Sequence, residues 1–140
     1  INTNFISTIA MIILIIDDFE KQKYGCLAVI TSVAGDRGRQ SNYVLGSVKA
    51  AVSTFLEGLH CRLNKENINI ITIKPGFVDT PMTAHLNKTL LFTEPQKIGM
   101  KIYSVIINGK NGVIYVPGYL RIIMFIIKNI PEFVFKKLSL

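Results

Sequence analysis

Two apolar, β-branched runs limit the folds open to this chain more than any other feature: "CLAVITS" at 26–32 and "INIITIKP" at 68–75. Runs of this length and composition are typical of strands buried on both faces of a parallel sheet. Between them, apolar residues recur at steps of three and four, at Val44, Val48, Val52, Phe55, Leu59 and Leu63. That spacing predicts an amphipathic helix, and therefore a β-α-β unit with a right-handed crossover.

The alternation continues toward the C-terminus. The stretch "TEPQKIGMKIYSVIING" predicts a second helix, with Thr93 as N-cap and Pro95 in the first turn, and "GVIYVP" at 112–117 predicts a third strand. Three strands are too few for a complete doubly wound sheet. We therefore expect residues 1–118 to form an α/β unit, the C-terminal half of a Rossmann-like, doubly wound parallel sheet, with the N-terminal dinucleotide-binding half absent.

The two ends of the chain have their own character. The apolar run at 9–16 is too short to span a bilayer, and it predicts a buried amphipathic helix entered in mid-chain. Residues 119–140 form an apolar and basic helical tail, which we expect to pack on the domain. The alternative is an interfacial helix, with Phe125, Phe133 and Phe135 in the acyl boundary and its cations at lipid headgroups.

Composition narrows the function classes. Of the 140 residues, 49% are hydrophobic and 18% charged, which excludes a disordered chain. The net charge of +7 comes from scattered basic residues without a nucleic-acid-binding module, so nucleic acid is not an expected partner. Cys26 and Cys61 are expected to be small buried side chains in a reducing cytosol, and neither they nor His60 and His85 have the spacing of metal ligands.

The motifs "ITSVAGDRGRQSNYVLGSVKA" and "IKPGFVDTPMT", together with "TNF" near the start, resemble the short-chain dehydrogenase/reductase family over nearly the whole chain. The tail is similar to that of the 2-keto reductases acting on polyprenyl-phospho-ribofuranose. The resemblance implies hydride transfer between NAD or NADP and a carbonyl or secondary alcohol, on a small-molecule or lipid-linked substrate. It also implies a cytoplasmic homo-oligomer, and residues 119–140 add a membrane surface as a candidate partner.

The family's catalytic residues are an Asn, a Ser, a Tyr and a Lys. Carried over by motif, the Asn is Asn4, with Asn2 as a rival, and the Ser is Ser32, whose hydroxyl would polarise the substrate carbonyl. The Lys is Lys49, which would bind the nicotinamide ribose and lower the pKa of a neighbouring phenol.

The motif "PGFVDT" implies the loop around the nicotinamide. It assigns cofactor contacts to Pro75, Gly76, Val78 and Thr80, beside those of Lys49. The strand end before this loop is where open α/β sheets bind ligands. The glycine-rich turn that receives the pyrophosphate in the family does not occur in this sequence, so we expect the chain alone to bind no cofactor.

The family's tyrosine position is Leu45, which can neither donate nor accept a proton. Tyr43 lies six residues before Lys49, off its helical face, and is not expected to substitute. A positioned acid contributes about 10²–10⁴-fold, so we expect this chain to be inactive by itself. The alternatives are a non-catalytic binding or membrane-apposed module, or a degenerate remnant. "GDRGRQ" predicts a solvated loop, with phosphate contacts from Arg37 and Arg39 as the alternative.

Overall fold

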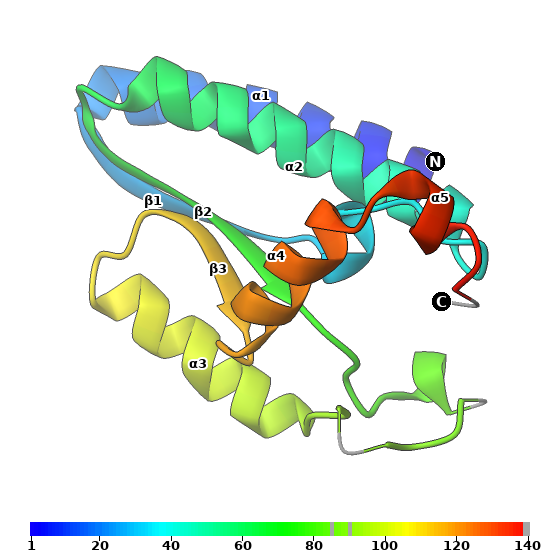
Figure 1. Ribbon diagram of the computed structural model, residues 1–140. Coiled ribbons are helices and arrows are strands. Elements are labelled where there is room, and N and C mark those ends of the chain that lie inside the picture. Colours follow the sequence, from blue (N-terminus) through cyan, green and yellow to red (C-terminus); the bar gives the residue numbers. More distant parts are fainter. Residues whose placement is uncertain (85, 90, 139–140) are drawn as a thin grey trace.

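The computed structural model describes residues 1–84, 86–89 and 91–138. Figure 1 shows the elements in their chain order, which confirms the predicted alternation of helices and strands. They are η1 (Asn2–Ile6), α1 (Ser7–Gln22), β1 (Tyr24–Ile30), η2 (Val33–Gly35), α2 (Tyr43–Leu63), β2 (Asn67–Pro75), η3 (Pro81–Thr83), α3 (Pro95–Ile107), β3 (Gly112–Val116), α4 (Leu120–Asn129) and α5 (Glu132–Phe135).

The three strands form one parallel sheet in the order β1-β2-β3, so the predicted α/β, Rossmann-like class is confirmed. In register, Tyr24 lies beside Asn67, and Ile71 lies beside Gly112. The first strand ends at Ile30, earlier than predicted. The chain leaves the strand there because Ser32 caps the single 3₁₀ turn η2, and its Oγ accepts a hydrogen bond from the Ala34 N–H at 3.1 Å.

The sheet is covered by helices on both faces (Figure 1). Helices α1 and α2 pack on one face, where Ile68 and Ile70 of β2 join their buried side chains. Helix α3 covers the opposite face, where Ile71 and Ile73 meet its Val105. The alternation of strand side chains between the two faces therefore explains why the β2 run is apolar almost without interruption.

Helix α1 is buried on one side only. Ile12 and Ile16 are each 3% exposed, whereas Met11 and Leu14 are 59% and 76% exposed, so the expectation of a buried helix is wrong for its outer face. The helical stretch Asn2–Gln22 has 21 residues, and an 18-residue window within it reaches a mean hydropathy of 1.3, enough in length and composition for a membrane span. Core helices and signal sequences share these properties, so length and composition do not distinguish between them.

The tail is docked by Arg37, from the loop that follows η2. Its guanidinium donates hydrogen bonds to the carbonyls of Ile127 at 2.5 Å and Ile130 at 2.6 Å, and lies 3.8 Å from the centre of the Phe135 ring. A cation at the C-terminal end of α4 also interacts favourably with the helix dipole. The expectation of a solvated loop is therefore wrong for Arg37, and Phe135 faces the protein.

Arg39 also contacts the tail rather than solvent. It lies beside α4, with its Nη2 atom 3.5 Å from the Met124 sulfur, and burial lowers the pKa of its guanidinium.

The cysteines differ from each other: Cys26 is half-buried in β1, and burial raises the pKa of its thiol, whereas Cys61 is exposed on α2. The expectation of two buried cysteines is therefore wrong for Cys61.

Candidate functional site

Ser32 lies just beyond the carboxyl end of β1, where the chain turns toward α2. Its oxygen accepts the hydrogen bond from Ala34, so the hydroxyl hydrogen is available to donate outward. The preceding residue, Thr31, is buried and donates its hydroxyl to the carbonyl of Ile73 at 3.2 Å, which ties the end of β1 to β2. Ser32 is therefore held at the carboxyl edge of the sheet with a free donor.

Close backbone packing joins the Ser32 turn to helix α2. A Cβ on Gly35 would lie 2.7 Å from the Ala50 nitrogen and 2.8 Å from the Lys49 carbonyl carbon. A Cβ on Gly46 would likewise lie 2.8 Å from the Ala34 carbonyl oxygen. Only glycine lets the turn and the helix approach this closely, so these two positions fix Ser32 relative to the first turns of α2.

Lys49 stands on α2 next to this contact. It is half-buried, and desolvation lowers the pKa of its ammonium. Among the described residues we find no hydrogen bond or ion pair that reaches its Nζ atom, so its donors are available to a ligand. The family's role for Lys49, a contact to ribose hydroxyls, fits a desolvated ammonium of this kind.

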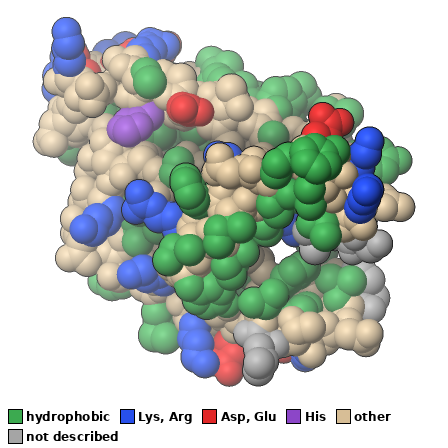
Figure 2. Space-filling model, in the orientation of Figure 1, with side chains coloured by type: hydrophobic (Ala, Val, Ile, Leu, Met, Phe, Trp, Pro, Cys, Tyr) green, Lys and Arg blue, Asp and Glu red, His purple; other side chains and the backbone are tan. Residues whose placement is uncertain are grey.

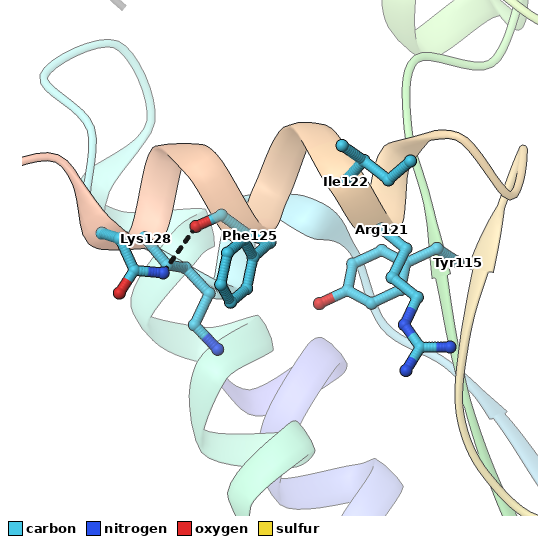
Figure 3. A pocket seen from close by; sticks show the side chains of 6 residues that line it. Tyr115, Arg121, Ile122, Phe125 and Lys128 are labelled. Atoms are coloured by element: carbon cyan, nitrogen blue, oxygen red, sulfur yellow. Dashed lines mark hydrogen bonds between the residues drawn. The ribbon is translucent and has the colours of Figure 1, made fainter.

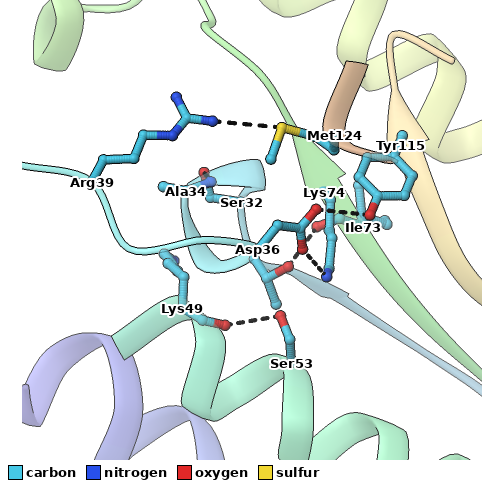
Figure 4. Close-up of polar contacts among 11 residues, drawn as sticks. Ser32, Ala34, Asp36, Arg39, Lys49, Ser53, Ile73, Lys74, Tyr115 and Met124 are labelled. Atoms are coloured by element: carbon cyan, nitrogen blue, oxygen red, sulfur yellow. Dashed lines mark hydrogen bonds and ion pairs between the residues drawn. The ribbon is translucent and has the colours of Figure 1, made fainter. Parts of the chain in front are cut away.

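A buried polar cluster, which the sequence did not predict, connects the Ser32 turn to strands β2 and β3 (Figure 4). Asp36 follows η2, has a side chain only 1% exposed, and forms an ion pair with Lys74 of β2, whose side chain is 10% exposed. Tyr115 of β3 donates its hydroxyl to the second Asp36 oxygen at 2.7 Å. Burial first, and then this hydrogen bond, raise the pKa of Tyr115.

The cluster connects the Ser32 turn to both neighbouring strand ends, because its three members come from the loop after η2, from β2 and from β3. The signal in the sequence was a single lysine, Lys74, inside the otherwise apolar run "INIITIKP". A buried lysine requires an acidic partner, but the sequence does not say which acid supplies it. Tyr115 is already bound to Asp36, and its raised pKa makes it a poor proton donor.

The loop after β2 lies at the same edge of the sheet. Thr93 donates its N–H to the Phe77 carbonyl at 2.9 Å and accepts from the Asp79 N–H at 3.0 Å, so Val78 sits in a short parallel bridge. The Val78 carbonyl accepts the Thr83 hydroxyl at 2.6 Å. Within the described residues the Val78 N–H has no partner, which fits the family's contact to the nicotinamide carboxamide.

The remaining cofactor-loop residues frame this bridge. Pro75 ends β2, and Gly76 donates its N–H to the Val116 carbonyl at 3.1 Å. Thr80 precedes η3 and donates its N–H to the Thr83 hydroxyl at 3.2 Å. The loop is thus held by hydrogen bonds close to the surface, and the roles assigned to its residues stay predictions.

Position 45 is the gap in this arrangement. Leu45 lies one helical turn before Lys49 and is 42% exposed. The family's tyrosine position is therefore open to solvent, but it carries an apolar side chain. Tyr43 is 66% exposed at the first residue of α2. No hydrogen bond that would draw Tyr43 toward Lys49 is found in the part of the chain that the structure describes.

Asn4 lies on η1, and its side chain is exposed. The N-terminus lies at the end of α1 that is beside the start of α2, so η1 is at the same end of the sheet as the Ser32 turn (Figure 1). Its relay role stays a prediction.

Among the described residues no group of three His, Cys, Asp or Glu side chains could hold a metal, and His85 lies outside them.

The candidate site thus consists of a hydroxyl donor, a desolvated ammonium and a backbone N–H without a partner among the described residues, on elements that meet at the carboxyl edge of a parallel sheet. This is the place where proteins of the doubly wound α/β class bind ligands. The sequence profile of the short chain dehydrogenase family matches residues 1–91. The chain therefore belongs to the short chain dehydrogenase family.

Curated relatives agree with this assignment. An oxidoreductase of Mycobacterium tuberculosis without assigned function is 28% identical over 138 residues, which cover 99% of this chain and 55% of the relative. A 3-oxoacyl-[acyl-carrier-protein] reductase of Chlamydia trachomatis is 36% identical over 92 residues, or 64% of this chain and 36% of the relative. The chain thus spans about half the length of the first of these.

Solved structures have the same fold. A 7β-hydroxysteroid dehydrogenase superposes with a TM-score of 0.77 at 18% identity, covering 99% of this chain and 56% of the other. A short chain dehydrogenase from Burkholderia cenocepacia, in complex with NADP, has a TM-score of 0.71 at 20% identity, covering 80% of this chain and 47% of the other. At these identities the likeness establishes the fold, including the confirmed Rossmann-like arrangement.

Proposed function

We propose that this chain supplies the carbonyl-activating part of an NAD(P)-dependent oxidoreductase, and that Leu45 leaves this part without its general acid. The reaction is hydride transfer between a nicotinamide and a carbonyl compound or secondary alcohol. The observation that carries the proposal is the joint placement of Ser32 and Lys49 at one sheet edge, locked together through Gly35. Family membership supports the reaction class.

The chain's own residues divide the work as follows. The Ser32 hydroxyl donates to the substrate oxygen and withdraws electron density from the carbonyl carbon. The Lys49 ammonium would bind ribose hydroxyls of the cofactor, and the Val78 N–H and Thr80 would orient its nicotinamide. A bound nicotinamide cofactor supplies the hydride. Asn4 supports the proton path, and Leu45 breaks that path because leucine has no titratable group.

The test uses a chimera. It joins residues 1–140 to the part of the Mycobacterium tuberculosis relative that lies outside the match, and NAD(P)H oxidation is followed with a panel of ketones. We expect Leu45→Tyr to raise the rate about 10²–10⁴-fold over the unaltered chimera. Ser32→Ala in that background should remove the gain, and Tyr43→Phe should leave it unchanged. Equal rates with Leu45 and Leu45→Tyr would contradict the proposal.

A second candidate, a non-catalytic binding module, is favoured by Leu45 itself. In that case the chimera binds NADPH, seen as enhanced coenzyme fluorescence, but Leu45→Tyr confers no turnover. Binding would then be retained for a purpose other than reduction. Loss of binding on Lys49→Met would support the ribose contact in either case.

We also propose that the cytoplasmic protein is a homodimer, formed through the outer face of α1. Met11 and Leu14 are exposed there, and large exposed apolar patches mark interaction surfaces. Sedimentation velocity on the chain and on Leu14→Glu tests this. A dimer that Leu14→Glu converts to monomer supports the proposal, and a monomer in both cases contradicts it.

A further inference from the structure

Helix α4 is apolar on two opposite sides. Leu120 and Met124 pack inward and are 7% and 1% exposed. On the outer side Ile122, Phe125 and Ile126 are 67%, 69% and 58% exposed. Their spacing of three and four residues places them in one stripe along the helix. Among the described residues only the inner side of α4 is covered, so its outer apolar side is open to a second apolar environment.

The stripe is held on a fixed frame. Arg37 binds the carbonyls of Ile127 and Ile130 at the end of α4 and stacks on Phe135 of α5. With Phe135 turned inward, Phe133 is left outward and is 65% exposed. The apolar surface made by Ile122, Phe125, Ile126 and Phe133 is called the tail face below.

Cations surround the tail face. Arg121 and Lys128, both exposed, line an open groove of about 610 Å³ together with Tyr115 and Phe125 (Figure 3). Lys136 adds a further exposed cation beyond α5, as does its neighbour Lys137. In Figure 2, hydrophobic side chains gather over α4 in the middle of the face, with Lys and Arg side chains beyond them over α5.

The charge identifies the occupant. The only acid of the tail is Glu132, in a chain whose net charge is +7. A second copy would bring four cations against four cations, so self-association through the tail face is disfavoured. Exposed apolar side chains flanked by Lys and Arg are the pattern of helices that lie in the interface of an anionic bilayer.

We propose that the tail face binds the surface of an anionic lipid bilayer. Ile122, Phe125 and Phe133 enter the boundary between headgroups and acyl chains, while Arg121 and Lys128 contact lipid phosphates. This inference stands on α4 and α5 and does not depend on the proposed oxidoreductase activity. It accounts for an apolar face that the described residues leave uncovered.

The first experiment uses tryptophan fluorescence. The chain contains no tryptophan, so a single introduced tryptophan gives the only indole signal. Phe125→Trp places an indole on the tail face, and Tyr103→Trp places one on α3, at a side chain 67% exposed, as the control. Vesicles of phosphatidylcholine with about one-third phosphatidylglycerol should shift the emission of Phe125→Trp to the blue, and brominated lipids should quench it. The emission of Tyr103→Trp should not change.

The second experiment measures co-sedimentation of the chain with the same vesicles. Each cation near a bilayer surface contributes about fivefold, so Lys128→Gln with Lys136→Gln should lower the partition coefficient about 25-fold at low salt. Lys101→Gln with Lys110→Gln, which removes two cations outside the tail, should have less than a fivefold effect. Phe133→Ser should weaken binding, whereas Met100→Ser, at an exposed apolar side chain of α3, should not. Circular dichroism checks that each variant is folded.

Three results would overturn the proposal. One is the absence of binding to anionic vesicles, which would leave the tail face to a protein partner. Another is binding that Met100→Ser weakens as much as Phe133→Ser does. The third is a blue shift of Phe125→Trp that rises with protein concentration without vesicles, which would identify a second copy as the occupant.

Discussion

Two loops meet at the carboxyl edge of the sheet, and they are built differently. The Ser32 turn is fixed from inside the protein, by the Asp36–Lys74 ion pair and by the close approach of Gly35 to α2. The Val78 loop is fixed near the surface, by Thr83 and by backbone hydrogen bonds. The difference indicates that the first loop is the more rigid of the two, as the proposed role of Ser32 requires, and that the second can adjust more easily.

The largest expected effect comes from removing the buried carboxylate. Asp36→Asn leaves the Lys74 ammonium buried without a counter-ion, which should lower the free energy of unfolding by about 3–5 kcal/mol. The matched control is Asp79→Asn, which removes the acid from the exposed pair with Lys88 at 2.7 Å and should cost less than about 1 kcal/mol. Urea denaturation compares them, and equal losses would break the distinction between the loops.

A smaller loss is expected when Tyr115→Phe removes the hydroxyl that binds Asp36. Hydrogen bonds to charged groups contribute about 1.5–3 kcal/mol, and Tyr119→Phe, at an exposed phenol, should be neutral. Because the folded state raises the pKa of Tyr115 above its unfolded value, this stabilisation is present below about pH 10 and is lost as pH rises further. Unfolding measured from neutral to alkaline pH should therefore show the two proteins converging. A difference that persists unchanged would contradict the assignment.

Gly35→Ala tests whether the Ser32 turn is locked against helix α2. The new Cβ would lie 2.7 Å from a backbone nitrogen, so α2 has to shift, at a cost of about 1–3 kcal/mol. Gly38→Ala, in the same loop but with nothing within 4 Å, should be tolerated. Thermal unfolding of both variants is the measurement, and similar midpoints would mean that the turn and the helix are not locked.

The smallest effect should come from the second loop. Thr83→Val removes the hydroxyl that binds the Val78 carbonyl, at a cost of about 0.5–1.5 kcal/mol. The change should be local, with faster amide hydrogen exchange in residues 78–83 and little change at Ser32. Exchange that increases equally in both loops would show that they form one unit.

Much of the fold follows from the sequence, because periodicity records burial. The β2 run is apolar because Ile70 and Ile71 face helices on opposite sides of the sheet. For the site, the motifs name Ser32, Lys49 and the Val78 loop, and the roles of these residues stay predictions. The partner of Lys74 was not predictable, since Asp36 lies 38 residues away in sequence and meets it only in the folded sheet.

The tail shows the same limit. Its sequence predicts a helical tail that is both apolar and basic, but it does not say which phenylalanines face outward. Arg37 decides this by binding the end of α4 and the Phe135 ring, over a separation of 90 residues from Ile127. Long-range polar contacts of this kind leave no periodic trace in the sequence, which is why a solvated loop was predicted instead.

In the proposed function, Lys49 is placed to act on a phenol at position 45, where this sequence has Leu45. The most direct test is the pKa of a phenol introduced there, in Leu45→Tyr labelled with ¹³C at tyrosine Cζ and titrated by NMR. With the Lys49 ammonium one helical turn away, we predict a pKa clearly below the usual value of about 10, returning toward 10 in Leu45→Tyr with Lys49→Met. A pKa at or above 10 that does not respond to Lys49→Met would contradict the account.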